Sequence, residues 1–263
     1  MFRFSDDELI VTDIGASSLI IVDYEGNLLN EPFNPDNLLD DPLSICVSSN
    51  REIYVGDSKQ FKIFVFDSSF RYKCEFGDED SLAIPNYIRC DVEQNDELYV
   101  SHYNTNLVTI WDNYMLAHRI DIEAPLDIVI SKDNFYISSA IRFEVKEDAP
   151  NELKNISNGL NSIFILSKLT FEVLKTIQLN WLSPGGLFLD THLNIYTVAY
   201  ELNEEKYKSE FKYLFIIDNN GNCLKKIQMN ELKGITDMVV VDDKIMFCAD
   251  QNCIRTFQFD FNA

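Results

Sequence analysis

The sequence has few of the residues and motifs on which catalytic and zinc sites are commonly built. It contains three histidines and six cysteines in 263 residues, and no cysteines stand in a C-x-x-C pair. Reduced, partly buried thiols fit this pattern better than a disulfide framework or a zinc site. A P-loop, a G-x-S-x-G motif and an H-E-x-x-H motif are also missing. The sequence therefore offers no recognisable catalytic set.

Long apolar runs are missing as well. The longest are far below the roughly 18 residues of a membrane span, and the N-terminal segment MFRFSDDELIV has no apolar core of the kind found in signal peptides. We therefore expect no membrane span and a location in the reducing cytoplasm.

Basic residues are scarce. The chain has 22 Lys and Arg against 43 Asp and Glu, which gives a formal net charge of -21, and residues 1–50 carry ten acids against the single base Arg3. Because proteins bind nucleic acids largely through Lys and Arg, this balance argues against a nucleic-acid partner. A solvated acidic surface is the simpler interpretation, and an acidic docking face for a basic protein partner is the alternative.

Short β-strand patterns are abundant, and they recur. Six segments of the same pattern are ELIVTD (8–13), EIYVGD (52–57), ELYVSH (97–102), NFYISS (134–139), NIYTVA (194–199) and KIMFCA (244–249). A further apolar strand follows each, and the residues that close it are Asp23, Asp67, Asp112, Ser167, Asp218 and Asp260. Their spacing is 44, 45, 55, 51 and 42 residues. The sequence is therefore built from six repeats, two of which carry insertions.

Four antiparallel strands repeated at this spacing are typical of a β-propeller blade. We predict an all-β, six-bladed β-propeller of four-stranded antiparallel blades that forms one domain over residues 1–263. The expected blades span about 1–35, 36–80, 81–121, 122–179, 180–229 and 230–263. A β-sandwich is the alternative fold. The last repeat stops after its third strand, so either the last blade is incomplete or the chain is part of a longer protein.

Residues 42–77 carry a family resemblance. A proline and an apolar strand are followed there by IYVGDS, IFVFD and FG, an order that resembles the NHL repeat. The resemblance implies a six-bladed propeller and suggests RNA binding. The GNNRI segment usual between the second and third strands is replaced by SKQFKI or YNTNLV, and the arginine that often follows it is absent from most repeats.

Two connections between second and third strands are much longer than the others, at 140–162 and 200–213. They belong to adjacent blades, so we expect them side by side on one face. Long loops on a rigid scaffold often carry binding sites, although surface insertions are also tolerated without function. The candidate partner-binding residues are Arg142, Glu144, Glu147, Asp148, Glu201, Glu204, Lys206 and Tyr207.

A second candidate site is predicted at one mouth of the central channel. The residues two places after each opening proline, and their equivalent in the last repeat, are Ser44, Tyr87, Asp127, Gly186 and Asp237. Two carboxylates with a hydroxyl and a phenol suit a small polar ligand or a hard cation such as Ca²⁺, for which Asp127 and Asp237 are the candidate ligands. Polar side chains around a hydrated pore are the simpler interpretation.

Three functions follow from these patterns. We favour a noncatalytic scaffold that binds a protein partner through the loop face of blades 4 and 5 without a cofactor. The alternative is a calcium-dependent hydrolase or lyase with its site at the channel mouth. An RNA-binding module of the NHL type is third, because the acidic charge opposes it.

Overall fold

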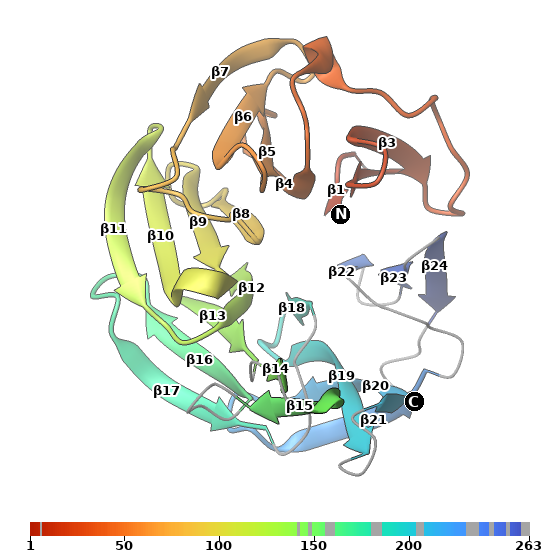
Figure 1. The fold of residues 1–263 in the computed structure, drawn as a ribbon, viewed down its shortest axis with the longest axis vertical. Helices are drawn as coiled ribbons and strands as arrows, with labels where there is room; N and C mark the ends of the chain where they lie inside the picture. The colour runs from red at the N-terminus through yellow and green to blue at the C-terminus, as the bar shows by residue number, and fades with distance from the viewer. Residues whose placement is uncertain are drawn as a thin grey trace.

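The strands of the protein are arranged as sheets around a central axis (Figure 1). A computed structural model describes residues 1–5, 7–140, 143–146, 149–155, 161–179, 186–203, 208–229, 237–241, 245–250 and 253–258. The helices within these ranges are two 3-10 turns, η1 (Pro35–Asn37) and η2 (Tyr103–Thr105). Neither has the length needed to cross a bilayer.

Four of the sheets have four antiparallel strands in meander order. Blade 2 contains β4 (Pro42–Val47), β5 (Ile53–Asp57), β6 (Lys62–Phe66) and β7 (Tyr72–Phe76). Blade 3 contains β8 (Tyr87–Asp91), β9 (Glu97–His102), β10 (Leu107–Asp112) and β11 (Met115–Asp121). Blade 4 contains β12 (Pro125–Ile130), β13 (Asn134–Ser139), β16 (Ser162–Ser167) and β17 (Val173–Gln178). Blade 5 contains β18 (Leu187–Leu189), β19 (Ile195–Asn203), β20 (Lys208–Ile217) and β21 (Cys223–Gln228).

Two further sheets have three strands each. Blade 1 contains β1 (Phe2–Arg3), β2 (Glu8–Asp13) and β3 (Ser18–Asp23), and isolated bridges from Leu19 to Phe33 and from Val22 to Leu28 mark its fourth edge. The other sheet contains β22 (Asp237–Val241), β23 (Ile245–Asp250) and β24 (Cys253–Gln258), and it lies between blade 5 and blade 1 (Figure 1). The prediction of an all-β propeller with four-stranded antiparallel blades is confirmed. The described residues form five blades rather than the predicted six, with the incomplete sheet β22–β24 at the sixth place.

The first strands line the inside of the ring, and the hydrophobic core lies between neighbouring blades. β4 contacts β8, β8 contacts β12, β12 contacts β18, and β18 contacts β22. Apolar side chains from one blade pack against the next, as Tyr54 and Ile63 of blade 2 pack against Ile88 and Trp111 of blade 3. A single blade leaves both faces apolar, so the ring arrangement is what removes them from water.

The aspartate that recurs at the end of the third strand has a structural role. The Oδ1 atom of Asp23 accepts hydrogen bonds from the backbone N–H groups of Glu25 and Asn27 at 3.0 and 2.7 Å. Asp67 and Asp218 do the same for the residues two and four places after them. In blades 1, 2 and 5 the carboxylate therefore fixes the turn to the fourth strand, which explains these aspartates by structure alone.

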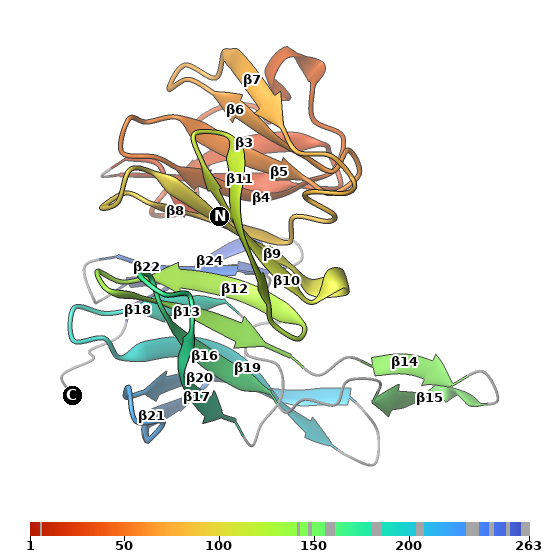
Figure 2. The same cartoon turned by 90° about the vertical axis from the view of Figure 1, so that its left-hand side faces the viewer.

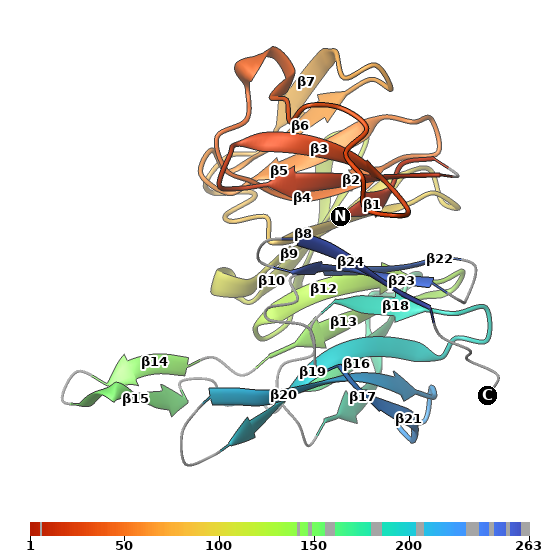
Figure 3. The ribbon, with the colours of Figure 1, turned by 90° about the vertical axis from the view of Figure 1, so that its right-hand side faces the viewer.

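Two hairpins project from one face of the ring (Figures 2 and 3). One consists of β14 (Phe143–Lys146) and β15 (Ala149–Asn155), inserted between β13 and β16. The other is the extended end of β19 and β20, which have nine and ten residues where the corresponding strands of blade 2 have five. These are the two insertions found in the sequence, and they leave adjacent blades in the same direction.

Candidate functional site

The loop face carries the connections between second and third strands, and the pairing register shows how much has been inserted there. In blades 1, 2 and 3 the last paired residues are Asp13 with Ser18, Asp57 with Lys62 and His102 with Leu107, so four residues close each turn. The equivalent pairs are Ser139 with Ser162 in blade 4 and Ala199 with Tyr213 in blade 5. Residues 140–161 and 200–212 therefore replace four-residue turns.

Two of the predicted partner-binding residues lie on the backbone of these hairpins. Glu144 is in β14 opposite Lys154, and Glu201 is in β19 opposite Phe211. The other six lie outside the described residues: Arg142, Glu147, Asp148, Glu204, Lys206 and Tyr207. The backbone thus brings the two insertions to one face, as the sequence predicted, and the roles of these side chains stay predictions.

The same face is acidic in the described loops that enter the first strands or close the second. The acids in the entry loops and four-residue turns of this face are Asp40, Asp41, Asp78, Glu79, Asp80 and Glu123, and the base there is Lys59. The described parts of the two hairpins are balanced, with four glutamates and the four lysines Lys146, Lys154, Lys208 and Lys212. Lys59 is paired with Asp40 at 2.8 Å. The loop face therefore has a surplus of negative charge over blades 2, 3 and 4.

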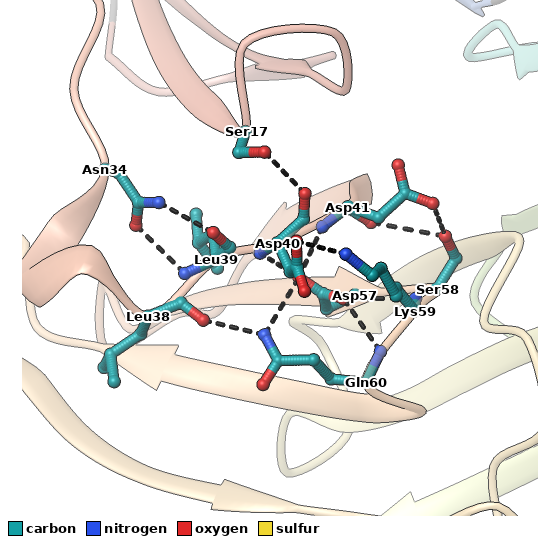
Figure 4. Close-up of polar contacts among 10 residues, drawn as sticks. All are labelled: Ser17, Asn34, Leu38, Leu39, Asp40, Asp41, Asp57, Ser58, Lys59 and Gln60. Atoms are coloured by element: carbon teal, nitrogen blue, oxygen red, sulfur yellow. Dashed lines mark hydrogen bonds and ion pairs between the residues drawn. The ribbon is translucent and has the colours of Figure 1, made fainter.

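The buried carboxylate of Asp57 connects the linker between blades 1 and 2 to the turn after β5 on this face (Figure 4). Asp57 is fully buried and accepts hydrogen bonds from the backbone N–H groups of Asp40 and Asp41 at 2.8 and 2.9 Å, and from those of Lys59 and Gln60 at 3.2 and 3.0 Å. The Gln60 amide also donates to the Leu38 carbonyl at 2.7 Å. Asp57 thus holds the linker between blades against the turn after β5.

The predicted channel-mouth residues lie on the inner strands. Ser44 is in β4, Tyr87 begins β8, Asp127 is in β12, and Asp237 begins β22, where it pairs with Ala249. Gly186 precedes β18. Ser44 is buried and donates a hydrogen bond to the Pro85 carbonyl at 3.3 Å, and the Arg89 guanidinium lies 5.9 Å from the Tyr87 ring centroid. These positions lie on first strands that contact one another around the ring, and Ser44 and Asp127 are buried. Their place at a channel mouth stays a prediction, and the Asp237 side chain lies outside the described residues.

Asp127 is the most strongly engaged of these residues. Its carboxylate forms an ion pair with Arg89 at 2.8 Å and accepts hydrogen bonds from the backbone N–H groups of Ile128 and Leu187, both at 2.8 Å. Arg89, Asp127 and Leu187 belong to the first strands of blades 3, 4 and 5. Asp127 therefore links three blades, and both of its oxygens already have donors.

Among the described residues, no group of three or more His, Cys, Asp or Glu side chains is placed to hold a metal ion. Asp127 is accompanied by a cation, Arg89, which opposes a second cation nearby. These contacts favour a structural role for Asp127. The prediction of a calcium site with Asp237 stays untested, because it depends on a side chain that is not described.

Comparison with known proteins shows the fold and no family. No family model matches the chain, and no curated protein sequence matches it. Similar solved structures include the hydrazine synthase of Kuenenia stuttgartiensis, with 10% identity over 96% of this chain and 73% of that one and a TM-score of 0.70. A streptogramin B lyase structure has 12% identity over 97% and 76% of the two chains and a TM-score of 0.66. The WD40 β-propeller domain of Doa1 has 11% identity over 99% and 92% and a TM-score of 0.61.

These similarities define the chain as a β-propeller protein. At such low identity they show the fold alone, because the same scaffold is shared by proteins with unrelated activities. Membership of the NHL-repeat family stays a prediction.

Proposed function

We propose that the protein is a noncatalytic propeller scaffold that binds a protein partner through the loop face of blades 4 and 5. The observation that carries this proposal is the projection of two inserted hairpins from adjacent blades in the same direction (Figure 3). Both replace four-residue turns that are sufficient to close blades 1, 2 and 3. The hairpins are therefore longer than closure of the two strands requires, and partner binding would explain their extra length.

The charge of the face supports a basic partner. On the same face, the described entry loops and four-residue turns over blades 2, 3 and 4 carry six acids and only Lys59 as a base, whereas the described parts of the hairpins carry equal numbers of acids and lysines. A positively charged partner is steered toward such a surface, and screening by salt weakens the attraction. Complex formation is therefore expected to weaken as the ionic strength rises.

Shortening both insertions tests the proposal. Residues 141–160 are replaced by two residues, which retains Ala140 and Asn161, and residues 200–212 are replaced by four residues. The pairs Ser139 with Ser162 and Ala199 with Tyr213 are kept, so the propeller should stay folded. Complex formation in an extract of the source cells should be lost. A variant with 141–160 scrambled keeps the length and composition and serves as the control for sequence-specific contacts.

Photo-cross-linking locates the partner on the molecule. A benzoyl-phenylalanine placed at position 144 or 201 should give one discrete cross-linked species that mass spectrometry can identify. The same group at position 172 is the control, because Glu172 is exposed in the turn before β17 on the opposite face. Equal cross-linking from position 172, or an unchanged complex in the shortened variant, would rule out the loop face.

We also infer that β22–β24 is the sixth blade. Met238 of β22 packs in the core of blade 5 with Leu214 and Met229, whereas its neighbour Val239 packs against Met1 and Leu9 of blade 1. Because successive side chains of a strand point to opposite faces, one strand covers both neighbours. A blade that closes the ring between blade 5 and blade 1 must contact both of them in this way.

We infer a reducing, cytoplasmic location from the thiols. Cys46 is fully buried, and burial raises the pKa of its thiol to about 12. Burial also raises the pKa of Cys74 and Cys90. Such thiols are packing residues that remain protonated and unreactive, which fits a protein that does not rely on disulfides.

The alternative function is a calcium-dependent hydrolase or lyase at the channel mouth. It is supported by the likeness to a streptogramin B lyase structure and by the position of Asp127 and Asp237 on inner strands. The ion pair between Arg89 and Asp127 weighs against it, because that carboxylate is already neutralised. We therefore rank this function second.

RNA binding is the third function and the least supported. The net charge of -21 opposes a phosphate backbone. Titration of labelled single-stranded RNA at low salt should give no saturable signal. Tight binding with a steep salt dependence would overturn this ranking and favour the NHL-type module.

A further inference from the structure

A pocket of about 90 Å³ lies between blades 2 and 3, away from every residue discussed above as a candidate site. The turns from β4 to β5, from β8 to β9 and from β10 to β11 form its walls. These turns join first to second and third to fourth strands, so the pocket opens on the face opposite the inserted hairpins. Its volume suffices for about three water molecules, or for a charged nitrogen with one or two carbons attached.

The accessible lining of the pocket is mostly polar, and nearly buried aromatic and apolar side chains lie beneath it. Tyr54 and Trp111 are each 4% exposed, and Leu98 is 3% exposed. The Phe76 ring packs behind the pocket at 5.1 Å from Trp111 and 5.6 Å from Tyr114, measured between ring centroids. The rings that line the pocket are thus held in place by contacts from both blades.

One wall carries Glu52 in a fixed position. Its carboxylate accepts hydrogen bonds from the hydroxyls of Tyr54 and Tyr114 at 2.9 and 3.1 Å and forms an ion pair with Lys73. Burial by itself would raise the pKa of Glu52, but the hydrogen bonds from Lys73 and the two tyrosines hold it below its ordinary value. Glu52 is therefore ionised at neutral pH.

The opposite wall carries Asp96, and its donors are neutral. Its carboxylate accepts hydrogen bonds from the N–H and Oγ–H groups of Ser49 at 2.7 and 2.6 Å, with longer contacts to the Asn50 amide and the Cys90 thiol. None of the ion pairs formed by the described residues includes Asp96. Among the described residues, Lys73 is the cation that pairs with one of these two carboxylates, which leaves the pair with a net negative charge.

The chemistry of the pocket selects among possible ligands. An anion would be repelled by this charge. A guanidinium has four heavy atoms in one plane, which is larger than the charged nitrogen with one or two carbons that the volume of the pocket admits. A compact ammonium group needs only aromatic faces, negative potential and scattered acceptors. The acceptors for an ammonium group are the side-chain carbonyls of three asparagines in the lining, Asn50, Asn95 and Asn113.

We propose that the pocket between blades 2 and 3 binds a protonated amine, either a small free amine or the terminal ammonium of a lysine side chain. The exposed Tyr114 ring contacts the carbon next to the nitrogen, and Asp96, which belongs to none of the ion pairs of the described residues, supplies the negative charge. This site is independent of the loop face, so a propeller with both insertions shortened should retain it.

Trp111 provides a reporter inside the pocket. The chain has two tryptophans, Trp111 and Trp181, and Trp181→Phe leaves Trp111 as the only source of indole fluorescence. Titration with methylammonium chloride and with N-acetyl-lysine amide should give saturable changes in its emission and should move its indole N–H resonance in NMR spectra. Sodium chloride at the same ionic strength and N-acetyl-norleucine amide, which has no charge, should give neither.

Asp96→Asn tests the charge with little risk to the fold. Asp96 has a φ of 58°, a left-handed conformation that asparagine tolerates well. The variant should bind both amines about tenfold more weakly, whereas Glu172→Gln, which removes an exposed charge from blade 4, should bind them as the wild type does. Unchanged binding by Asp96→Asn, or no saturable response of Trp111 in the wild-type sequence, would overturn the proposal. Tighter binding of the lysine amide than of methylammonium would identify a lysine side chain as the source, and the reverse order a free amine.

Discussion

The guanidinium of Arg89 lies 2.8 Å from the carboxylate of Asp127 and joins the first strand of blade 3 to that of blade 4. The two side chains are 14% and 0% exposed. The backbone N–H of Leu187 donates to the same carboxylate from blade 5. Asp127, which the sequence predicts as a candidate calcium ligand, therefore also links three blades. Experiments can separate the structural role from the predicted role in metal binding.

Asp127→Ala should destabilise the propeller strongly. The substitution leaves Arg89 as a nearly buried charge without this partner, which typically costs about 3–5 kcal/mol in the free energy of unfolding. Urea unfolding monitored by circular dichroism measures the change. The double variant Arg89→Met with Asp127→Leu is the control, and it should be markedly more stable than the single variant because no charge is left uncompensated. Wild-type stability of Asp127→Ala would contradict the structural role.

Calcium should have little effect on the melting temperature. Both oxygens of Asp127 already accept hydrogen bonds or an ion pair, so a bound cation would have to displace Arg89. Melting curves recorded with excess Ca²⁺ and with a chelator should coincide. A fall of several degrees on chelation, absent in Asp237→Ala, would show a native-state cation and favour the hydrolase or lyase alternative.

Asp57→Ala should destabilise the junction between blades 1 and 2. The substitution removes the acceptor of four backbone N–H groups, those of Asp40, Asp41, Lys59 and Gln60. Buried donors left without acceptors cost about 1–3 kcal/mol each, and local relaxation recovers part of this, so we expect a loss of about 3 kcal/mol or more. Amide hydrogen exchange should accelerate at Asp40 and Asp41.

Lys59→Ala is the matched control for this substitution. It removes the Lys59–Asp40 ion pair of the same cluster, whose side chains are 66% and 46% exposed. Exposed ion pairs contribute about 0–1 kcal/mol. A loss in Asp57→Ala no larger than in Lys59→Ala would mean that the buried carboxylate does not hold the linker.

The repeated strands could be predicted from sequence because their signal is local. The predicted strands ELYVSH at 97–102 and NFYISS at 134–139 have the same bounds as β9 (Glu97–His102) and β13 (Asn134–Ser139). Alternating or continuous apolar residues between turn residues are enough to define such strands. Blade 1 was predicted with four strands, and its fourth is represented only by the bridges at Leu28 and Phe33.

The sites could not be predicted in the same way, because they depend on contacts between repeats. Arg89 and Asp127 are 38 residues apart, and Glu52 and Tyr114 are 62 apart. The recurring glutamate that opens the second strand, as in EIYVGD, was the signal closest to the amine pocket. It did not indicate which neighbour the side chain would face, since that depends on how adjacent blades pack.

A buried histidine gives the propeller a pH dependence that can be stated in advance. His102 is 1% exposed, its Nδ1 lies 3.3 Å from the Ile84 carbonyl oxygen, and its Nε2 lies 2.8 Å from Thr109 Oγ1. The Trp111 indole N–H donates to the same Thr109 oxygen at 2.8 Å. Thr109 can then donate its proton to Nε2 while Nδ1–H donates to the carbonyl, which requires the neutral imidazole. Burial lowers the pKa of His102 to about 4.

Stability should therefore fall as the pH decreases from about 6.5 to about 4. The unfolded chain binds a proton at His102 with the ordinary pKa of about 6.5, whereas the folded chain resists it down to about 4. Between these values the unfolded state holds more protons, so acid favours unfolding, and above pH 6.5 the contribution is complete and constant. A shift of this size corresponds to about 3 kcal/mol once the pH is below both pKa values.

The contribution of His102 is separated from that of the many carboxylates in the chain by subtracting the unfolding free energy of a His102 variant from that of the wild type at each pH. The unfolding free energies of the wild type and of His102→Gln, measured by urea titration at intervals from pH 4 to pH 7.5, should differ by an amount that shrinks by about 3 kcal/mol from the top of the range to the bottom. His192→Gln, at an exposed histidine, is the control for the exchange of histidine for glutamine. If the difference between the unfolding free energies of the wild type and His102→Gln does not change with pH, His102 is protonated as readily in the folded protein as in the unfolded one. The hydrogen-bonded arrangement of a neutral His102 with Thr109 and Trp111 would then be wrong.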